Sequence, residues 1–253
     1  MRLLVSVRSA AEVDPALAGG ADVIDAKEPS RGSLGPVSAD TLTRILVRLP
    51  SNRAFSAALG DFASDAAVVA GITALDLPPR QAPTFLKLGF AGVTSPMLVG
   101  RLLTSAVQVA AELPTAPLIV AVAYADAQQA GTMSAQLICQ LAYEARAAGV
   151  LIDTYRKAGS GLLEWISPTT LAAWVCDARQ AGLLCAVAGG LRLDDLEAVQ
   201  AAAPDIVGFR GAACDGGRSG EISAERVAGL RRHLDQVLGR TVRHPPEGAW
   251  QNA

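Results

Sequence analysis

The amino-acid sequence predicts an α/β protein that folds as a single (β/α)8 barrel. Apolar, strand-like runs alternate along the chain with longer alanine- and leucine-rich segments of helical periodicity. Eight such strand–helix units occur in about 240 residues, which is the number that closes a parallel barrel. An open doubly wound sheet has the same alternation, but no G-x-G-x-x-G motif follows the first strand.

The expected strands are short runs rich in valine, isoleucine, leucine and alanine. They span residues 2–7, 22–27, 53–59, 84–90, 117–124, 150–153, 183–188 and 205–209. The expected helices span residues 10–18, 38–48, 63–74, 96–111, 134–147, 169–180, 193–202 and 223–238. Helix-start signals such as Ser167-Pro168, and glycines such as Gly149 and Gly182 at helix ends, support these boundaries.

Length and composition limit the class of protein. The 253 residues suit one large domain or two small ones, and no linker or change of composition divides them. We therefore expect one barrel domain over residues 1–238, followed by a polar tail over residues 239–253. A net charge of −2 without a basic block argues against nucleic acid as a partner. No apolar run is long enough to span a membrane, which argues against a membrane partner.

The cysteine and histidine content argues against a metal site. The four cysteines are far apart and form no C-x-x-C pair, which is typical of free thiols in a reducing compartment. The two histidines, His233 and His244, lie in an arginine-rich expected helix and in the tail. We therefore expect neither a metal ion nor a cofactor. The chain begins directly with a strand and shows no signal peptide, which predicts a cytoplasmic location.

The chain contains only three lysines, and all three fall near the carboxyl ends of expected strands. Lys27 ends the second strand, Lys87 lies inside the apolar fourth strand, and Lys157 follows the sixth strand. Active sites of (β/α)8 barrels lie at this end, and even-numbered strands contribute to common layers of the interior. We therefore predict that the three amino groups meet at one site.

Lys87 indicates the chemistry of that site. A lysine inside an apolar strand is costly unless it is paired or neutral, and neighbouring cations favour the neutral amine. A neutral amine is the nucleophile of Schiff-base catalysis and a competent base. Asp25 and Asp153, on the second and sixth strands, can hold the remaining ammonium groups and transfer protons. The structural alternative is a buried salt-bridge network without chemistry.

Glycine-rich turns follow the last two expected strands. Gly189 and Gly190 follow the seventh, and Arg210, Gly211 and Ala212 follow the eighth. In many barrels these two loops bind phosphate through backbone N–H groups. We therefore predict a phosphate site here, with the Arg210 guanidinium as a cationic clamp.

Other residues have less specific predicted roles. Arg218 is a second candidate clamp, and the turn at residues 32–35 is a candidate second anion site at the start of the next helix, or an ordinary loop. Tyr124 and Asp126 are candidates for substrate contact or, for the tyrosine, for covering the core. Trp174 and the alanine-rich helices are candidates for core packing or for contacts in a homo-oligomer.

A series of short motifs runs along the whole barrel region. They are Leu4-Val-Ser6, Gly19-Gly-Ala-Asp-Val-Ile-Asp-Ala-Lys27, Gly32-Ser-Leu-Gly35, Leu86-Lys-Leu-Gly89, Tyr124-Ala-Asp-Ala127, Asp153-Thr154 with Lys157, Ala188-Gly189 and Gly208-Phe-Arg-Gly-Ala-Ala-Cys214. In this order the set resembles the (5-formylfuran-3-yl)methyl phosphate synthase family. The resemblance extends from about the first residue to residue 238, and the tail is additional to the family pattern.

The resemblance implies a carbon–oxygen lyase of methanofuran biosynthesis, a part of one-carbon metabolism. Its substrate would be a triose phosphate: two molecules of glyceraldehyde 3-phosphate would condense, with loss of phosphate and water, into (5-formylfuran-3-yl)methyl phosphate. By the same resemblance, Lys27 matches the family's Schiff-base lysine and Lys87 its proton acceptor. Asp25, Asp153 and Lys157 match the other charged residues of the family's site. The loop directly after Lys27 departs from the family pattern.

Two other functions stay open at this point. A class I Schiff-base aldolase or isomerase acting on another sugar phosphate would use the same lysine chemistry. A non-catalytic barrel acting as a subunit would form no covalent bond with a triose phosphate. Product analysis separates the first of these from the synthase, and trapping of an imine on Lys27 separates the second.

Overall fold

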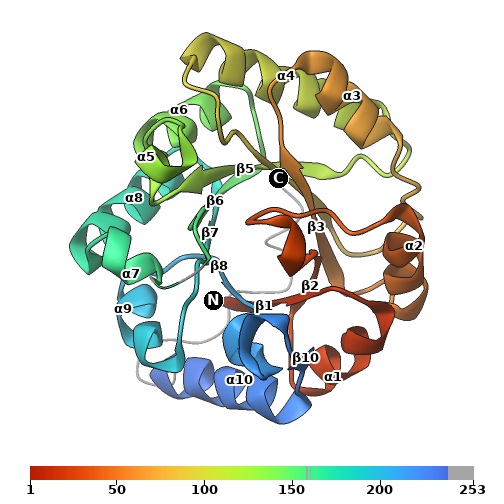
Figure 1. Ribbon diagram of the computed structural model, residues 1–253, viewed down its shortest axis with the longest axis vertical. Helices are drawn as coiled ribbons and strands as arrows, with labels where there is room; N and C mark the ends of the chain where they lie inside the picture. The colour runs from red at the N-terminus through yellow and green to blue at the C-terminus, as the bar shows by residue number, and fades with distance from the viewer. Residues whose placement is uncertain (158, 160, 239–253) are drawn as a thin grey trace.

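The computed structural model describes residues 1–157, 159 and 161–238 and shows a closed barrel of eight parallel strands (Figure 1). The strands are β1 (Arg2–Val7), β2 (Val23–Ala26), β3 (Ala54–Asp61), β4 (Thr84–Gly89), β5 (Leu118–Tyr124), β6 (Gly149–Asp153), β7 (Leu184–Val187) and β8 (Ile206–Phe209). Each strand pairs with the next in the sequence, and β1 pairs with β8 to close the ring. The predicted (β/α)8 fold is confirmed, and every predicted strand is present within two residues of its expected ends. The expected tail lies outside the described residues.

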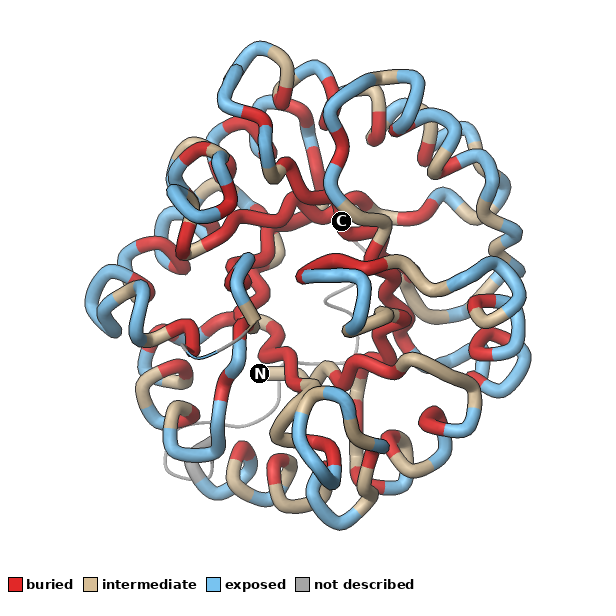
Figure 2. The backbone as a smooth tube through the Cα atoms, viewed as in Figure 1, coloured by how far each residue is buried: buried red, intermediate tan, exposed pale blue. Residues whose placement is uncertain are grey.

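The helices form an outer layer around the barrel (Figures 1 and 2). They are α1 (Val13–Ala18), α2 (Ala39–Arg48), α3 (Asp65–Thr73), α4 (Pro96–Glu112), α5 (Ala127–Ala130), α6 (Ala135–Glu144), α7 (Leu162–Trp165), α8 (Pro168–Gln180), α9 (Leu196–Ala201) and α10 (Ala224–Leu238). Serine hydroxyls accept a hydrogen bond from the first turn of five of them, at Ser38, Ser64, Ser95, Ser134 and Ser167. These caps satisfy backbone N–H groups that a helix leaves unpaired, which is why the serine positions predict the helix starts well.

Two apolar layers hold the barrel together. Outward-facing strand residues pack against the helices in one large cluster, whereas inward-facing ones form a second, smaller cluster inside the barrel. Trp174 of α8 is fully buried in the outer cluster, and its Nε1 donates to the carbonyl of Ala135 on α6 at 3.0 Å. The indole packs within one chain, which confirms the core-packing alternative for Trp174 over a contact between subunits.

The loops at the carboxyl ends of the strands contain short elements that the sequence pattern does not reveal. They are η2 (Pro29–Arg31), η4 (Gly211–Ala213), β9 (Cys214–Asp215), η5 (Gly217–Ser219) and β10 (Glu221–Ile222), together with α5 and α7. A further 3-10 turn, η1 (Ala10–Glu12), precedes α1, and another, η3 (Leu193–Asp195), precedes α9. Elements of two to four residues are shorter than one period of the hydrophobic pattern, so periodicity cannot detect them.

The β2–α2 loop lies over the open end of the barrel (Figure 1). Ser33 donates from its hydroxyl to the carbonyl of Thr154 at 2.8 Å, and Leu34 is buried in the inner cluster. Helix α2 begins only at Ala39 and is capped by the Ser38 hydroxyl. Residues 32–35 fold back over the barrel instead of leading directly into the helix, so the turn does not lie at the helix start, and its binding of a second anion stays a prediction. In the part of the chain that the structure describes, no helix is long and apolar enough to cross a membrane.

Candidate active site

A cavity of about 380 Å³ lies in the barrel and is bordered by the loops at the carboxyl ends of the strands. This volume lies within the range of small-molecule sites. All ten site residues predicted from the sequence line it: Asp25, Lys27, Lys87, Asp153, Lys157, Gly189, Gly190, Arg210, Gly211 and Ala212. Apolar side chains of the inner cluster line the rest, including Leu4, Phe85, Val120, Leu151 and Ile206.

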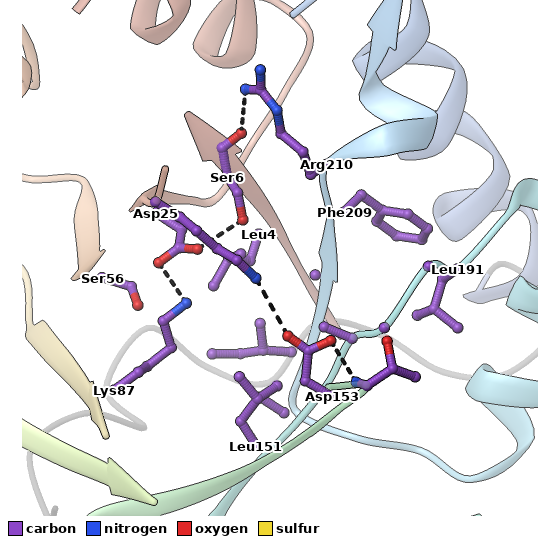
Figure 3. A pocket seen from close by; sticks show the side chains of 18 of the residues that line it. Leu4, Ser6, Asp25, Ser56, Lys87, Leu151, Asp153, Leu191, Phe209 and Arg210 are labelled. Carbon is purple, nitrogen blue, oxygen red and sulfur yellow. Dashed lines mark hydrogen bonds and ion pairs between the residues drawn. The ribbon is translucent and has the colours of Figure 1, made fainter. Parts of the chain in front are cut away.

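The three lysines meet two carboxylates in this cavity. Figure 3 shows Lys87 paired with Asp25, and Asp153 nearby. Lys87 Nζ is 2.7 Å from Asp25 Oδ1, Lys27 Nζ is 3.3 Å from Asp153 Oδ2, and Lys157 Nζ is 2.5 Å from Asp153 Oδ1. All five side chains are at most 13% exposed. The cluster therefore contains one more amine than carboxylate, and Asp153 is shared between two amines.

Neighbouring strands fix the two carboxylates. Asp25 of β2 pairs in register with Ser6 of β1, and the Ser6 hydroxyl donates to Asp25 Oδ2 at 2.7 Å. Asp25 thus contacts Ser6 through one oxygen and Lys87 through the other. Asp153 accepts a hydrogen bond at 2.7 Å from the backbone N–H of Thr154, which orients its carboxylate toward both amines.

Burial and charge shift the pKa values of this cluster. Burial lowers the pKa of Lys87, and the Lys27 charge lowers it further, against the opposing effect of Asp25. Burial also lowers the pKa of Lys157 to about 8, although the Asp153 charge opposes this. Burial alone would raise the pKa of Asp153, but Lys157 and Lys27 outweigh it and hold that pKa well below its usual range. The arrangement thus places a stable carboxylate, Asp153, beside Lys157, an amine that loses its proton more readily than an exposed lysine does.

The turn after β7 approaches the charged cluster closely. Gly189 and Gly190 adopt positive φ angles of 116° and 61°, which other residues rarely adopt. A Cβ atom at Gly189 would lie 3.0 Å from the backbone nitrogen of Thr154. Glycine is therefore required for this loop to pass next to Asp153, and the backbone of the predicted phosphate loop borders the lysine site.

The Arg210 side chain is fully engaged within the protein. Its Nη1 donates to the carbonyl of Ser6 at 3.0 Å and to Glu12 at 2.5 Å, and its Nη2 donates to Glu12 at 2.9 Å and to the carbonyl of Gly220 at 2.7 Å. Its Nε donates to the carbonyl of Arg218 at 3.1 Å. A guanidinium has five N–H donors, so these bonds use them all. The prediction of Arg210 as a cationic clamp is therefore wrong for its side chain, which ties the β1 and β8 loops together.

Arg218 is the other arginine predicted as a clamp. Its side chain lines the cavity, and its Nη2 donates to the carbonyl of Gly32 at 2.8 Å. This bond joins the loop after β8 to the β2–α2 loop over the barrel. Burial lowers the pKa of Arg218, whereas the charge of Asp153 opposes that shift.

Tyr124 and Asp126 do not line the cavity. The Tyr124 hydroxyl donates to Asp61 Oδ1 at 2.8 Å, and Asp126 accepts from the backbone nitrogens of Tyr155 and Arg156. Both side chains thus fix loops around the site. Both residues therefore have structural roles instead of the predicted substrate contacts. The Tyr124 ring belongs to the inner core, and the Asp126 carboxylate orders the loop after β6.

Two residues that sequence reasoning missed have clear roles in the structure. Glu12, at the end of η1, is 4% exposed and forms the ion pair with Arg210. Ser56 of β3 lines the cavity next to Asp25, its register partner. The sequence carries a signal for Ser56, since it is the one polar residue among the inward positions of that predicted strand, between Ala54 and Ala58. No local signal links Glu12 to an arginine almost two hundred residues away.

The donor groups of the site are amines and carboxylates. Among residues 1–157, 159 and 161–238, no three His, Cys, Asp or Glu side chains converge as metal ligands would. Cys214, near the phosphate loop, is buried, and burial raises the pKa of its thiol. The grouped lysines and aspartates are suited to amine and carboxylate chemistry, with the lysines as nucleophile and base.

Solved structures of low identity share the fold. Phosphoribosyl anthranilate isomerase from Thermus thermophilus superposes with a TM-score of 0.60 at 15% identity, over 94% of this chain and 100% of the other. KGPDC from Streptococcus mutans gives a TM-score of 0.60 at 15% identity, over 93% of this chain and 98% of the other. Likeness at this level of identity supports the (β/α)8 architecture alone.

Sequence relatives are much closer. The (5-formylfuran-3-yl)methyl phosphate synthase of Methanocaldococcus jannaschii is 34% identical over 239 residues, which cover 91% of this chain and 98% of that protein. The synthase of the same name from Methanopyrus kandleri is 32% identical and covers 95% of this chain and 98% of its own. A protein from Streptomyces griseus with this name, marked putative, is 32% identical over 85% of this chain and 86% of its own. A family model described as 4-HFC-P synthase matches residues 3–231, and the chain therefore belongs to the 4-HFC-P synthase family.

Proposed function

We propose that the protein condenses two molecules of glyceraldehyde 3-phosphate into (5-formylfuran-3-yl)methyl phosphate, as a lyase of methanofuran-type cofactor biosynthesis. One phosphate and two water molecules leave, which balances the atoms of the two trioses. The observation that carries this proposal is the group of three lysine amines and two carboxylates around one cavity, in a chain of this family. An amine nucleophile, a base and acids in one place can catalyse carbon–carbon bond formation between aldehydes, and this cluster has all three.

Lys27 is the proposed nucleophile. Its Nζ lies 3.3 Å from Asp153 Oδ2 at the cavity, so the carboxylate orients the amine, and loss of the ammonium proton to solvent gives the nucleophile. The neutral amine then attacks the aldehyde carbon of the first triose phosphate, and loss of water gives an imine. Protonated, this imine withdraws electrons from the adjacent carbon, so that a proton there can be removed and a bond formed to the second aldehyde.

Lys87 is the proposed base for that proton. The lowered pKa of its buried amine favours the form that accepts a proton. Asp25, 2.7 Å away, stabilises the ammonium that results, and Ser6 keeps the carboxylate in place. The pair can therefore take up a proton without leaving an isolated buried charge.

Lys157 is the proposed acid for the oxygens that leave. Its pKa of about 8 makes it a ready proton donor near neutral pH, and Asp153 holds it at 2.5 Å. It lines the cavity together with Arg218 and the glycine turn after β7. A proton delivered there would neutralise a departing hydroxyl or phosphate.

The phosphate groups are proposed to bind at the loops after β7 and β8. Gly189, Gly190, Gly211 and Ala212 line the cavity, and the first N–H groups of the η4 turn have no partner inside that turn. Arg218 supplies a cation beside them, and Lys157 a second one. The Arg210 guanidinium takes no part in this binding because its donors are used within the protein.

The test combines product analysis with trapping. We expect the purified protein and glyceraldehyde 3-phosphate to give a furan aldehyde, detected by its ultraviolet absorbance and by mass spectrometry. Borohydride added during turnover should reduce the imine and leave a mass increment on the peptide that contains Lys27. The Lys27→Arg variant keeps the positive charge but cannot form this imine, so both product and label should be lost.

Two results would contradict this proposal. Labelling of Lys27 with retro-aldol products and no furan would identify a class I aldolase on another sugar phosphate. A Lys27→Arg enzyme that still forms the furan at the wild-type rate would exclude the Schiff base. The Lys27→Met variant is a second control, because it removes the amine and adds no charge to the cavity.

A further inference from the structure

Ser56 presents the least expected polar group in the cavity. It lies at the middle inward position of β3, between Ala54 and Ala58, and it is 2% exposed. Ala54 and Ala58 belong to the inner apolar cluster, so Ser56 is the one β3 residue that lines the cavity. Register places Ser56 beside Asp25 on one side and Phe85 on the other, and Figure 3 shows it next to the Asp25–Lys87 pair.

The Ser56 hydroxyl has no hydrogen-bond partner among the residues that the structure describes. Its neighbour Asp25 accepts the Ser6 hydroxyl on Oδ2, whereas Asp25 Oδ1 lies in a 2.7 Å ion pair with Lys87 and, like the Ser56 hydroxyl, has no hydrogen-bond partner among the described residues. A buried hydroxyl without a partner destabilises a folded protein, and alanine would fit the same position at lower cost. A lone hydroxyl on the wall of a cavity is therefore suited to a partner that enters the cavity.

We propose that the Ser56 hydroxyl binds an oxygen of the substrate's carbon chain, and so selects a hydroxylated or carbonyl-bearing chain over an apolar one. The assignment rests on the proposed function for the identity of the substrate, a triose phosphate. The oxygen in question is a hydroxyl or carbonyl oxygen remote from the phosphate. A phosphate group at this position would meet the buried carboxylate of Asp25, the register partner of Ser56, and the two negative charges would repel each other.

The proposed contact explains how a carbon chain that carries an oxygen on every carbon is held in a cavity with many apolar lining residues. The phosphate is bound at the mouth, where the glycine turns and Arg218 lie, and the carbon chain extends inward. One hydrogen bond at the inner end then fixes the chain against the Asp25–Lys87 pair. A substrate chain that lacks this oxygen would leave the hydroxyl unpaired, and such a penalty is an effective means of discrimination.

Binding of two unreactive ligands tests this role separately from turnover. sn-Glycerol 3-phosphate carries two hydroxyls on its carbon chain, whereas n-propyl phosphate carries none. By isothermal titration calorimetry, Ser56→Ala should raise the Kd of glycerol 3-phosphate roughly tenfold and leave that of propyl phosphate unchanged. With glyceraldehyde 3-phosphate, the variant should lower kcat/KM by a similar factor while borohydride still labels Lys27.

A matched control separates binding from folding. Ser105 of α4 lies outside the cavity and donates from its hydroxyl to Asp65, so Ser105→Ala should leave both ligand affinities unchanged. Because Ser56 is unpartnered in the free protein, Ser56→Ala should keep or raise the Tm, whereas a structural serine would lower it.

The proposal is overturned if Ser56→Ala binds both phosphates with wild-type affinity. It is equally overturned if the variant weakens both ligands to the same extent with a lowered Tm, since that outcome indicates general damage to the barrel. Failure of the proposed function would show in the product analysis, where the wild-type protein would form no furan from glyceraldehyde 3-phosphate. The calorimetric comparison does not depend on that product, so the two failures can be distinguished.

Discussion

Two clusters of buried charge lie at the same end of this barrel, and they differ in how fully their hydrogen-bond donors are satisfied. In one, Glu12 and Arg210 form a pair in which both side chains are at most 8% exposed. Glu12 accepts two hydrogen bonds from the guanidinium, and three backbone carbonyls take the remaining donors of Arg210. Every donor has an acceptor, so nothing remains for a ligand.

The lysine cluster is about as buried, but it contains more amines than carboxylates. Three amines share the carboxylates of Asp25 and Asp153, and a cavity adjoins them. The pKa values of Lys87 and Lys157 are lowered as a result of burial and of the Lys27 charge. The comparison shows that burial of charge alone does not indicate chemistry. Amines in excess of carboxylates beside a cavity do indicate catalysis, because such amines can gain and lose protons next to a bound substrate.

Removal of the Lys87 amine should have the largest effect on the reaction without preventing its first step. We expect Lys87→Met to lower kcat by about 10²–10⁴-fold, which is the usual contribution of a positioned base. Borohydride should still label Lys27, because imine formation precedes proton removal. Single-turnover measurements with mass spectrometry would check both. Loss of the Lys27 label together with kcat would instead assign Lys87 a role in forming the imine.

Removal of the Glu12 carboxylate should break its buried ion pair with Arg210 and destabilise the folded protein. Glu12→Ala leaves the Arg210 guanidinium buried without its carboxylate, which typically costs about 3–5 kcal/mol of unfolding free energy. Below its Tm the variant should keep kcat close to the wild-type value, since Glu12 lies outside the lysine site. Urea unfolding and steady-state kinetics measure the two effects. As a control, Asp40→Ala removes an exposed ion pair with Arg44 and should change stability far less. A stable but inactive Glu12→Ala enzyme would contradict the distinction between the two clusters.

The pH dependence of turnover sharpens the assignment of Lys157. With a pKa of about 8, its ammonium is mostly present at neutral pH and is lost as the pH rises through that value. If this ammonium is the acid, kcat should fall by about tenfold per pH unit above pH 8. Lys157→Arg keeps the charge but cannot donate its proton, so its lower rate should lack this inflection. An increase of wild-type kcat through pH 8 would show that the neutral amine is the active form.

The local pattern of the sequence predicts the barrel and the lysine positions well. Alternating strand and helix periods determine the (β/α)8 order, and serine caps mark helix starts such as Ser134 and Ser167. In a parallel barrel, the strand order fixes which strand ends lie together, so Lys27, Lys87 and Lys157 could be assigned to one site. These features depend on neighbours within a few residues or on the regular geometry of the fold.

Other features depend on contacts between distant segments, and only the tertiary structure decided them. Arg210 changes from a predicted phosphate clamp to a structural residue because Glu12, far away in the sequence, satisfies its guanidinium. The turn at residues 32–35 closes over the barrel because Ser33 finds the Thr154 carbonyl. Ser56 becomes a candidate ligand contact only because the fold leaves its hydroxyl without a hydrogen-bond partner at the wall of the cavity. The sequence by itself determined which side chains reach the end of the barrel. The tertiary structure decided which of them remain free to act, because hydrogen-bond satisfaction depends on all the partners that the fold brings within reach.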